Sequence, residues 1–118
     1  MNREIKFRAF DDGQSLYTPI STNYCISRFF ELIRKDAKLM QFTGREDAEI
    51  NGTEVYESDI IENCDTKALQ VVYWNDDKAA WYCRYVDDEK RVVSLSDSLG
   101  NLNKVVGNIY ENPELINK

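Results

Sequence analysis

The sequence predicts a mainly β fold, a small barrel or roll with one inserted helix near the N-terminal end. Short segments that alternate apolar and polar residues recur along the 118 residues, and turn residues separate them every eight to twelve positions. Only one long segment has helical periodicity. A chain of this length buries roughly two-thirds of its unfolded surface, so we expect one domain that folds without metals or disulfides.

The N-terminal 38 residues predict a strand followed by the helix. The strand runs from Arg3 to Phe10, with one face formed by Ile5, Phe7 and Ala9 and the other by Lys6, Arg8 and Phe10. Residues 11–13 make a turn, and Gln14 to Thr18 pairs back. Residues 21–38 change to helical spacing, with the apolar stripe Ile26, Phe29, Phe30, Ile33 and Ala37.

Residues 39–118 predict the barrel-like region. The expected strands are Leu39 to Thr43, a hairpin around Asn51-Gly52, a strand from Asp59, then Leu69 to Trp74, Ala79 to Val86, Arg91 to Leu95 and Val105 to Tyr110. The core candidates alternate correctly within these strands. They are Tyr56, Ile60, Val71, Tyr73, Trp81, Cys83, Val93, Val105 and Ile109, and which of Trp74 and Trp81 faces inward stays open.

Composition and charge favour a soluble cytoplasmic protein. The net charge of −6 repels phosphate backbones and anionic membranes at long range, although a local basic patch is compatible with it. No apolar run reaches the length of a membrane span, and we expect no signal peptide. The three cysteines match no zinc or redox spacing, so buried free thiols are expected at Cys25 and Cys83.

The sequence lacks the residues of most catalytic sites. It has no histidine and no glycine-rich phosphate loop, so we expect neither an enzyme nor a cofactor. Residues 44–65 contain eight acids against one base, Arg45, which is typical of a solvated face. A bound hard cation, and with it a metal-dependent hydrolase, is the weaker alternative.

Two groups of residues are candidates for contact with a partner. Lys6 and Arg8 share one strand face and could touch nucleic acid, although two charges are a weak footprint. Trp74 lies in an aromatic hairpin with Trp81, which suits core packing first and a stacking platform second. Cys25 and Leu32 widen the helix stripe that contains Phe29 and Phe30 beyond what one small barrel needs to cover, so we expect part of this face to lie between subunits.

Four motifs of the sequence resemble the YopX family of phage and prophage proteins. They are Arg3-Glu4-Ile5-Lys6-Phe7-Arg8-Ala9-Phe10-Asp11, Leu39-Met40-Gln41-Phe42-Thr43-Gly44, Glu54-Val55-Tyr56-Glu57-Ser58-Asp59-Ile60-Ile61 and Val106-Gly107-Asn108-Ile109-Tyr110-Glu111-Asn112-Pro113. Two positions depart from the family pattern: Phe10 stands where the family has Trp, and Ser58 stands where it usually has Gly. If position 58 needs positive φ, Ser costs roughly 1 kcal/mol there.

The resemblance implies an accessory protein of phages and integrated elements with an SH3-type barrel in its C-terminal part, and it implies no catalytic residues. Fold alone does not give function. We therefore expect a non-enzymatic protein that acts through contacts with itself and with an unknown phage or host protein. A nucleic-acid-binding module that uses the barrel surface is the alternative.

Overall fold

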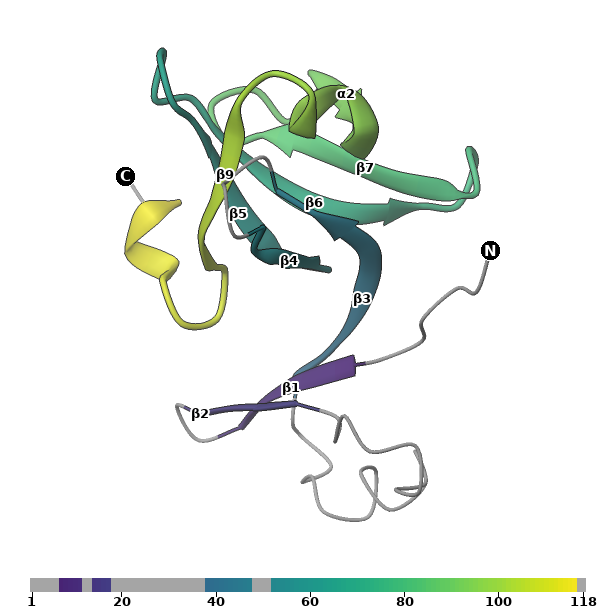
Figure 1. The fold of residues 1–118 in the computed structure, drawn as a ribbon, viewed down its shortest axis with the longest axis vertical. Helices are drawn as coiled ribbons and strands as arrows, with labels where there is room; N and C mark the ends of the chain where they lie inside the picture. Colours follow the sequence, from purple (N-terminus) through teal and green to yellow (C-terminus); the bar gives the residue numbers. More distant parts are fainter. Residues whose placement is uncertain (1–6, 12–13, 18–37, 48–51, 117–118) are drawn as a thin grey trace.

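The computed structural model describes residues 7–11, 14–17, 38–47 and 52–116, and these form a mainly β protein (Figure 1). The predicted N-terminal helix, with Phe29 and Phe30, lies outside the described residues, as do Lys6 and Cys25. The elements in chain order are β1 (Phe7–Asp11), β2 (Gln14–Tyr17), β3 (Lys38–Glu46), β4 (Glu54–Tyr56), β5 (Asp59–Asn63), β6 (Leu69–Asn75), β7 (Ala80–Tyr85), β8 (Val92–Ser94), α2 (Leu95–Leu99), β9 (Asn103–Asn108) and the 3-10 helix η1 (Pro113–Leu115).

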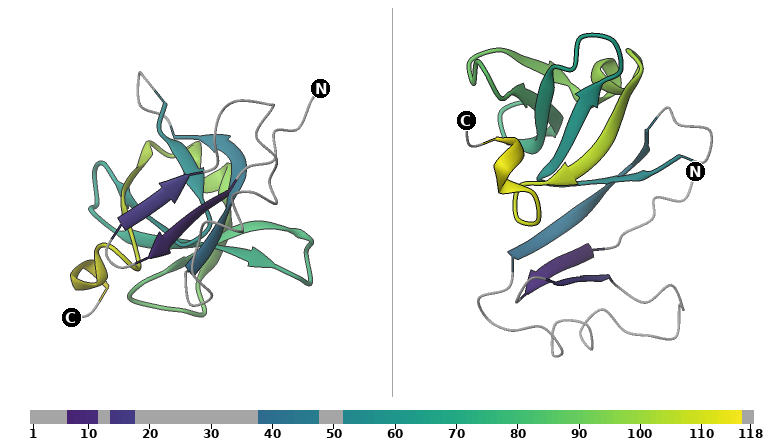
Figure 2. Two further views of the ribbon diagram at one scale, coloured as in Figure 1. Left: turned by 90° about the horizontal axis from the view of Figure 1, so that it is seen from below. Right: turned by 90° about the vertical axis from the view of Figure 1, so that its left-hand side faces the viewer.

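The strands form two antiparallel sheets. One has the order β2-β1-β3-β4 and the other the order β8-β7-β6-β5-β9. Figure 2 shows the two sheets as separate layers, with β1 and β2 set apart from the five-stranded sheet. The prediction of a closed barrel is therefore wrong. The spacing of turns indicates how many strands the chain has but not which sheet edges pair.

The strand predictions are confirmed over most of the described chain. β1 pairs with β2 and with β3 in antiparallel register, as Arg8 opposite Tyr17 and Met40 shows. β6 and β7 form the predicted hairpin. β3 begins at Lys38, which the predicted helix had included, and it extends to Glu46, three residues beyond its predicted end. It is long enough to pair with β1 at one end and with β4 at the other.

The short helix α2 was missed by the sequence reading, which expected a strand through Leu95. Ser94 caps it by accepting a hydrogen bond from the backbone N–H of Asp97, and Gly100 follows its last turn. Leu95 and Leu99 lie one turn apart and are both buried. A serine before an acidic residue three positions later is the sequence signature of such a helix start.

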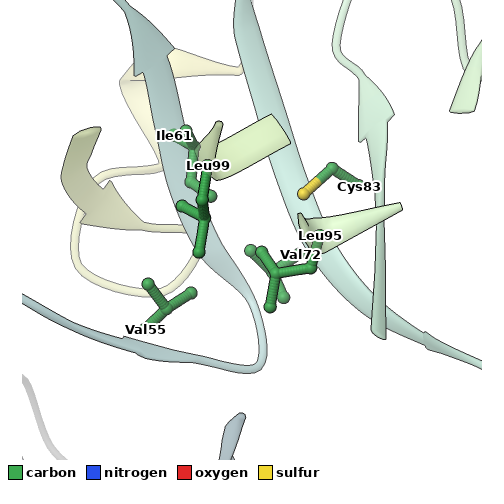
Figure 3. Close-up of a cluster of buried hydrophobic side chains, with 6 residues drawn as sticks. All are labelled: Val55, Ile61, Val72, Cys83, Leu95 and Leu99. Carbon is green, nitrogen blue, oxygen red and sulfur yellow. The ribbon is translucent and has the colours of Figure 1, made fainter. Parts of the chain in front are cut away.

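The main core lies between α2, β4 and one face of the five-stranded sheet. Figure 3 shows its six buried side chains converging from these elements: Val55, Ile61, Val72, Cys83, Leu95 and Leu99. Trp81, Val93 and Val105 are partly buried against this cluster. Because Val72 is opposite Cys83 in the register, both project from the same face of the sheet.

The predicted core residues divide between the two faces of the five-stranded sheet. Cys83, Trp81, Val93 and Val105 belong to the α2 side. Ile60 and Val71 are opposite each other in the register and, like Tyr56, are buried. The remaining two candidates, Tyr73 and Ile109, are half-buried. Because neighbouring residues of a strand point to opposite faces, Ile60 and Val71 project from the face away from the α2 cluster, so both faces of the five-stranded sheet carry buried residues.

The turn from β4 to β5 leads the chain from one sheet into the other. Glu57 donates its backbone N–H to the Gln41 carbonyl in the first sheet, and Ser58 donates to the Val72 carbonyl in the second. Ser58 has φ 71°, so this position does require the left-handed conformation that favours the glycine usual in YopX-type sequences. The condition that the sequence analysis set for position 58, a positive φ, is therefore met, and the energetic cost of Ser there stays a prediction.

Candidate functional site

A buried ion pair joins the two sheets. The Arg8 guanidinium of β1 donates through Nη2 to Oδ1 of Asp59 at the start of β5, and both side chains are almost fully buried. The other carboxylate oxygen, Oδ2, accepts a hydrogen bond of 2.7 Å from the backbone N–H of Tyr56. Asp59 therefore closes the β4–β5 turn and holds Arg8 at the same time.

The environment of Arg8 is apolar and aromatic. Its guanidinium carbon lies 4.6 Å from the centre of the Tyr56 ring, and its Nε lies 3.4 Å from the Met40 sulfur. Phe42 packs on the same tyrosine at 5.4 Å between ring centres. Farther along β1, Phe10 stacks on Tyr110. The face of β1 that carries Arg8 and Phe10 thus contacts β4, β5 and the segment after β9.

Burial changes the acidity of the carboxylate in this pair. It raises the pKa of Asp59 to about 6, and the repulsion from Glu111 acts in the same direction. The positive charge of Arg8 and the Tyr56 N–H lower the pKa, but by less than burial raises it. At neutral pH the carboxylate is ionised, and a modest fall in pH would protonate it.

A pocket of about 310 Å³ opens beside the ion pair. Besides Arg8 and Asp59 its lining includes Tyr56, Gly107, Asn108 and Glu111. Asn108 holds the chain after β9, because its Oδ1 accepts the backbone N–H groups of Tyr110 and Glu111. A side chain at Gly107 would collide with the Asn112 carboxamide. The four motifs that resemble the YopX family therefore meet at this junction between the sheets.

The hairpin of β6 and β7 carries aromatic pairs on both of its faces. Trp74 and Trp81 are opposite in the register and form an edge-to-face pair with ring centres 5.1 Å apart. Tyr73 and Tyr82 form the pair on the other face. Trp74 is 40% exposed, whereas Trp81 packs against the core cluster and its buried Nε1 lacks a hydrogen-bond partner in the described structure. Both indoles lie on one face, and Trp81 is the inner one.

A second and larger pocket, of about 500 Å³, lies where β5, β6 and β7 approach the loop after α2. We call it the amide pocket, because four residues with side-chain amides line it: Asn63, Gln70, Asn101 and Asn103. Sequence reasoning missed it. The signal available was Gln70, a polar residue on the same strand face as Val72 and therefore at an interior position.

The site residues predicted from the sequence differ in how exposed they are in the structure. Trp74 is exposed, and its role as a contact residue stays a prediction. Arg8 is 5% exposed, so the expected charged face of the first strand is wrong at this residue: its charge is matched by Asp59, which lies far away in sequence. Lys6, Phe29 and Phe30 lie outside the described residues.

The acidic segment is not simply a solvated face. Asp47 and Asp59 are buried, and Asp47 accepts hydrogen bonds from the backbone N–H groups of Thr53 and Val105. Glu57 accepts the backbone N–H of Gln41. Within the described ranges no cluster of three or more acidic or cysteine side chains is arranged to hold a metal ion. The same ranges contain no helix with the length and apolarity to cross a bilayer.

The comparison with known proteins identifies the family. The model of the YopX protein family matches residues 6–117, so the chain belongs to the YopX family. Among solved structures, the crystal structure of protein EF1440 from Enterococcus faecalis is similar, with a TM-score of 0.60 and 23% identity over 98% of this chain and 100% of that one. This similarity shows the fold. The comparison with curated proteins gives no match.

Proposed function

We propose that this YopX-family protein is a non-enzymatic accessory protein of phages or integrated elements, acting in the bacterial cytoplasm through protein–protein contacts that include self-association. The observation that carries the proposal is the exposed Trp74 at the β6–β7 hairpin. Tryptophan and tyrosine are the residue types that contribute most to protein interfaces. Figure 1 shows that the end of this hairpin extends outward, away from β9 and the C-terminal turn.

The hairpin is suited to such a contact because its shape is fixed before binding. Trp74 is held edge-to-face by Trp81, and the Arg84 guanidinium lies 5.5 Å from the Tyr73 ring on the opposite face. A rigid aromatic side chain loses little conformational entropy on association. The outermost strand on this side, β8, has only three residues, so it leaves part of the β7 edge uncovered for pairing with a second copy.

Sedimentation velocity over a concentration series tests this proposal. We expect the wild-type protein to associate and the Trp74→Ser variant to remain a monomer at concentrations where the wild type is a dimer or larger. Leu102→Ser is the matched control, because Leu102 is 60% exposed but lies after α2, away from the hairpin. A wild-type protein that stays monomeric at the highest concentration would contradict the proposal, and so would a Trp74→Ser variant that associates like wild type.

The nucleic-acid-binding alternative has less support. It could use the surface of the β region or the basic strand face with Lys6 and Arg8, and the second option is weakened because Arg8 is buried in an ion pair. Its test is the mobility of single-stranded DNA or RNA at low salt, where attraction to phosphates is strongest. A salt-dependent shift would favour this alternative over a purely protein-directed role.

A further inference from the structure

The amide pocket is lined by a buried polar side chain, that of Gln70, with unused hydrogen-bonding capacity. Its volume of about 500 Å³ lies within the usual range of small-molecule sites, roughly 300–1,000 Å³. It is separate from the ion-pair pocket, with which it shares no lining residue. Nothing in the family match or in the proposed protein contacts explains it.

Gln70 supplies the unused group. Its side chain lies on the inner face of β6 and is 3% exposed, and Oε1 accepts a hydrogen bond of 2.6 Å from the Ser98 hydroxyl. Ser98 Oγ also accepts from Asn103 Nδ2, and Ser98 is a hydrogen-bond partner of the Cys83 thiol as well. Gln70 is oriented with Oε1 toward Ser98. The amide nitrogen Nε2 of Gln70 has no hydrogen-bond partner among the described residues, so it is available to a ligand in the pocket.

The surrounding amides hold this site in one geometry. Asn63 Nδ2 donates to Asn103 Oδ1 at 2.7 Å and to the Asn101 carbonyl at 3.0 Å, and Asn103 Nδ2 also donates to the Ser98 carbonyl. Asn63 Oδ1 accepts the backbone N–H groups of Asp65 and Thr66. These groups are engaged with one another, so they form a rigid wall and leave Gln70 Nε2 as the donor offered to a ligand.

A flat stacking surface adjoins the free donor. Tyr85 is directly opposite Gln70 in the β6–β7 register, and the Arg91 guanidinium carbon lies 4.2 Å from the centre of the Tyr85 ring. Arg91 is exposed, so the outer plane of its guanidinium is open to a second planar group. Asp65 lines the same pocket and is exposed, which adds a hydrogen-bond acceptor. A planar surface beside one donor and one acceptor matches the face and the edge of a nucleobase.

We propose that the amide pocket binds a single nucleobase, with Gln70 Nε2 donating to an acceptor on the base edge and the Arg91 guanidinium stacking on the base plane. The same chemistry is presented by a free nucleoside and by one unpaired base of a single strand. Only one base is involved, so the acidic charge of the protein is no obstacle.

Nuclear magnetic resonance titration of the 15N-labelled full chain tests this proposal. The probes are adenosine, cytidine, guanosine and uridine, short homopolymeric single strands of each base, and methyl riboside as the sugar without a base. We expect at least one base to give saturable shifts centred on residues 63–70, 85–91 and 98–103. Binding of the free nucleoside indicates a free ligand, whereas binding of the strand alone indicates a base in a strand, and either result supports the proposal.

Two variants separate the ligand contact from the structural role of Gln70. Gln70→Glu keeps an oxygen for Ser98 to donate to but removes the amide donor, and Gln70→Met removes both. We expect each to weaken base binding by about tenfold or more, because a site built around a donor loses most when the donor is removed. Arg91→Ala should weaken the binding of all bases similarly. Leu39→Ser, at an exposed position on β3 outside the pocket lining, should bind like wild type.

Several results would overturn the proposal. They are the absence of saturable shifts at millimolar nucleoside and strand, equal binding of methyl riboside, and wild-type affinity in a folded Gln70→Glu variant. Thermal melting of each variant shows whether a loss of binding reflects the missing donor or an unfolded chain. If Gln70→Met melts early, Gln70→Glu alone decides the outcome.

Discussion

Arg8 and Asp59 are 51 positions apart in the chain and form an ion pair in the interior, where the four-stranded and five-stranded sheets meet. Tyr56 contributes to both partners, because its ring lies under the guanidinium and its backbone N–H donates to the carboxylate. Three residues from two of the YopX-like motifs, Arg8, Tyr56 and Asp59, thus form one interaction. In this chain these residues hold the two sheets in their arrangement.

Replacing Arg8 should be strongly destabilising at neutral pH. Arg8→Met keeps much of the side-chain volume but leaves the Asp59 carboxylate buried without a cation, which typically costs about 3–5 kcal/mol of unfolding free energy. Urea unfolding followed by circular dichroism measures it. Arg45→Met is the control, since Arg45 is exposed and donates to Ser96 on the surface, so its loss should cost about 1 kcal/mol or less. A loss no larger for Arg8→Met than for Arg45→Met would contradict the interpretation.

The pH dependence of stability should show the raised pKa of Asp59. The folded protein holds this proton up to pH of about 6, whereas the unfolded chain releases it near 3.8. Between these values the folded state binds more protons, so the contribution of Asp59 is complete below 3.8 and is lost as the pH rises through 6. The stability of wild type relative to Asp59→Asn should therefore fall from pH 4 to pH 7, by up to about 3 kcal/mol. A difference that is constant or rises with pH would show that the pKa is not raised.

The left-handed turn at Ser58 predicts a stabilising substitution. Ser58→Gly removes the strain of φ 71° and should raise the unfolding free energy by about 0.5–1 kcal/mol, after the larger entropy of glycine in the unfolded chain is subtracted. Gly44→Ala is the opposite test, because Gly44 has φ 87° and open space where a Cβ would lie. It should lose about 1 kcal/mol from backbone strain alone. Thermal unfolding of both variants tests this prediction. Melting temperatures equal to that of the wild type would rule out backbone strain at these positions.

The alternation of side chains was sufficient to predict the strands but not their assembly. The β6–β7 hairpin follows from two apolar runs around a polar turn, and Ile60, Val71 and Cys83 are buried as expected. Closure of the sheets depends on long-range pairing that no local pattern encodes. The short helix α2 was lost because Leu95 continues the apolar pattern of β8, and only the capping by Ser94 separates them.

The sites were harder to predict than the strands because each depends on partners distant in sequence. From the sequence alone, Arg8 is interpreted as a surface charge and Asp59 as one of many exposed acids. Only the fold shows that the two side chains form a buried ion pair. The amide pocket combines Gln70 with Ser98 and Asn103, which belong to different elements. Which of Trp74 and Trp81 faces inward could not be predicted either, because the two are directly opposite in the register and equally far from the turn; the exposed one is Trp74.

The two cysteines of the described structure should differ sharply in reactivity. Cys64 is exposed, whereas Cys83 lies in the core cluster with no exposed surface, and burial raises the pKa of its thiol to about 11. Because only the thiolate reacts rapidly, Cys83 is protected both by its position and by its protonation. In a Cys25→Ser background, Ellman's reagent at pH 8 should therefore label one thiol quickly, and peptide mapping should assign it to Cys64.

The second thiol should appear only when the protein unfolds. In urea, Cys83 should react at the rate of a free cysteine, and in native buffer its labelling should follow the opening of the core cluster between β7 and α2. The variant that carries both Cys25→Ser and Cys64→Ser provides the control, since it should show no fast reaction at all. Rapid labelling of Cys83 in that folded variant would mean that α2 does not cover the five-stranded sheet in solution, and that the core drawn in Figure 3 is open to the solvent.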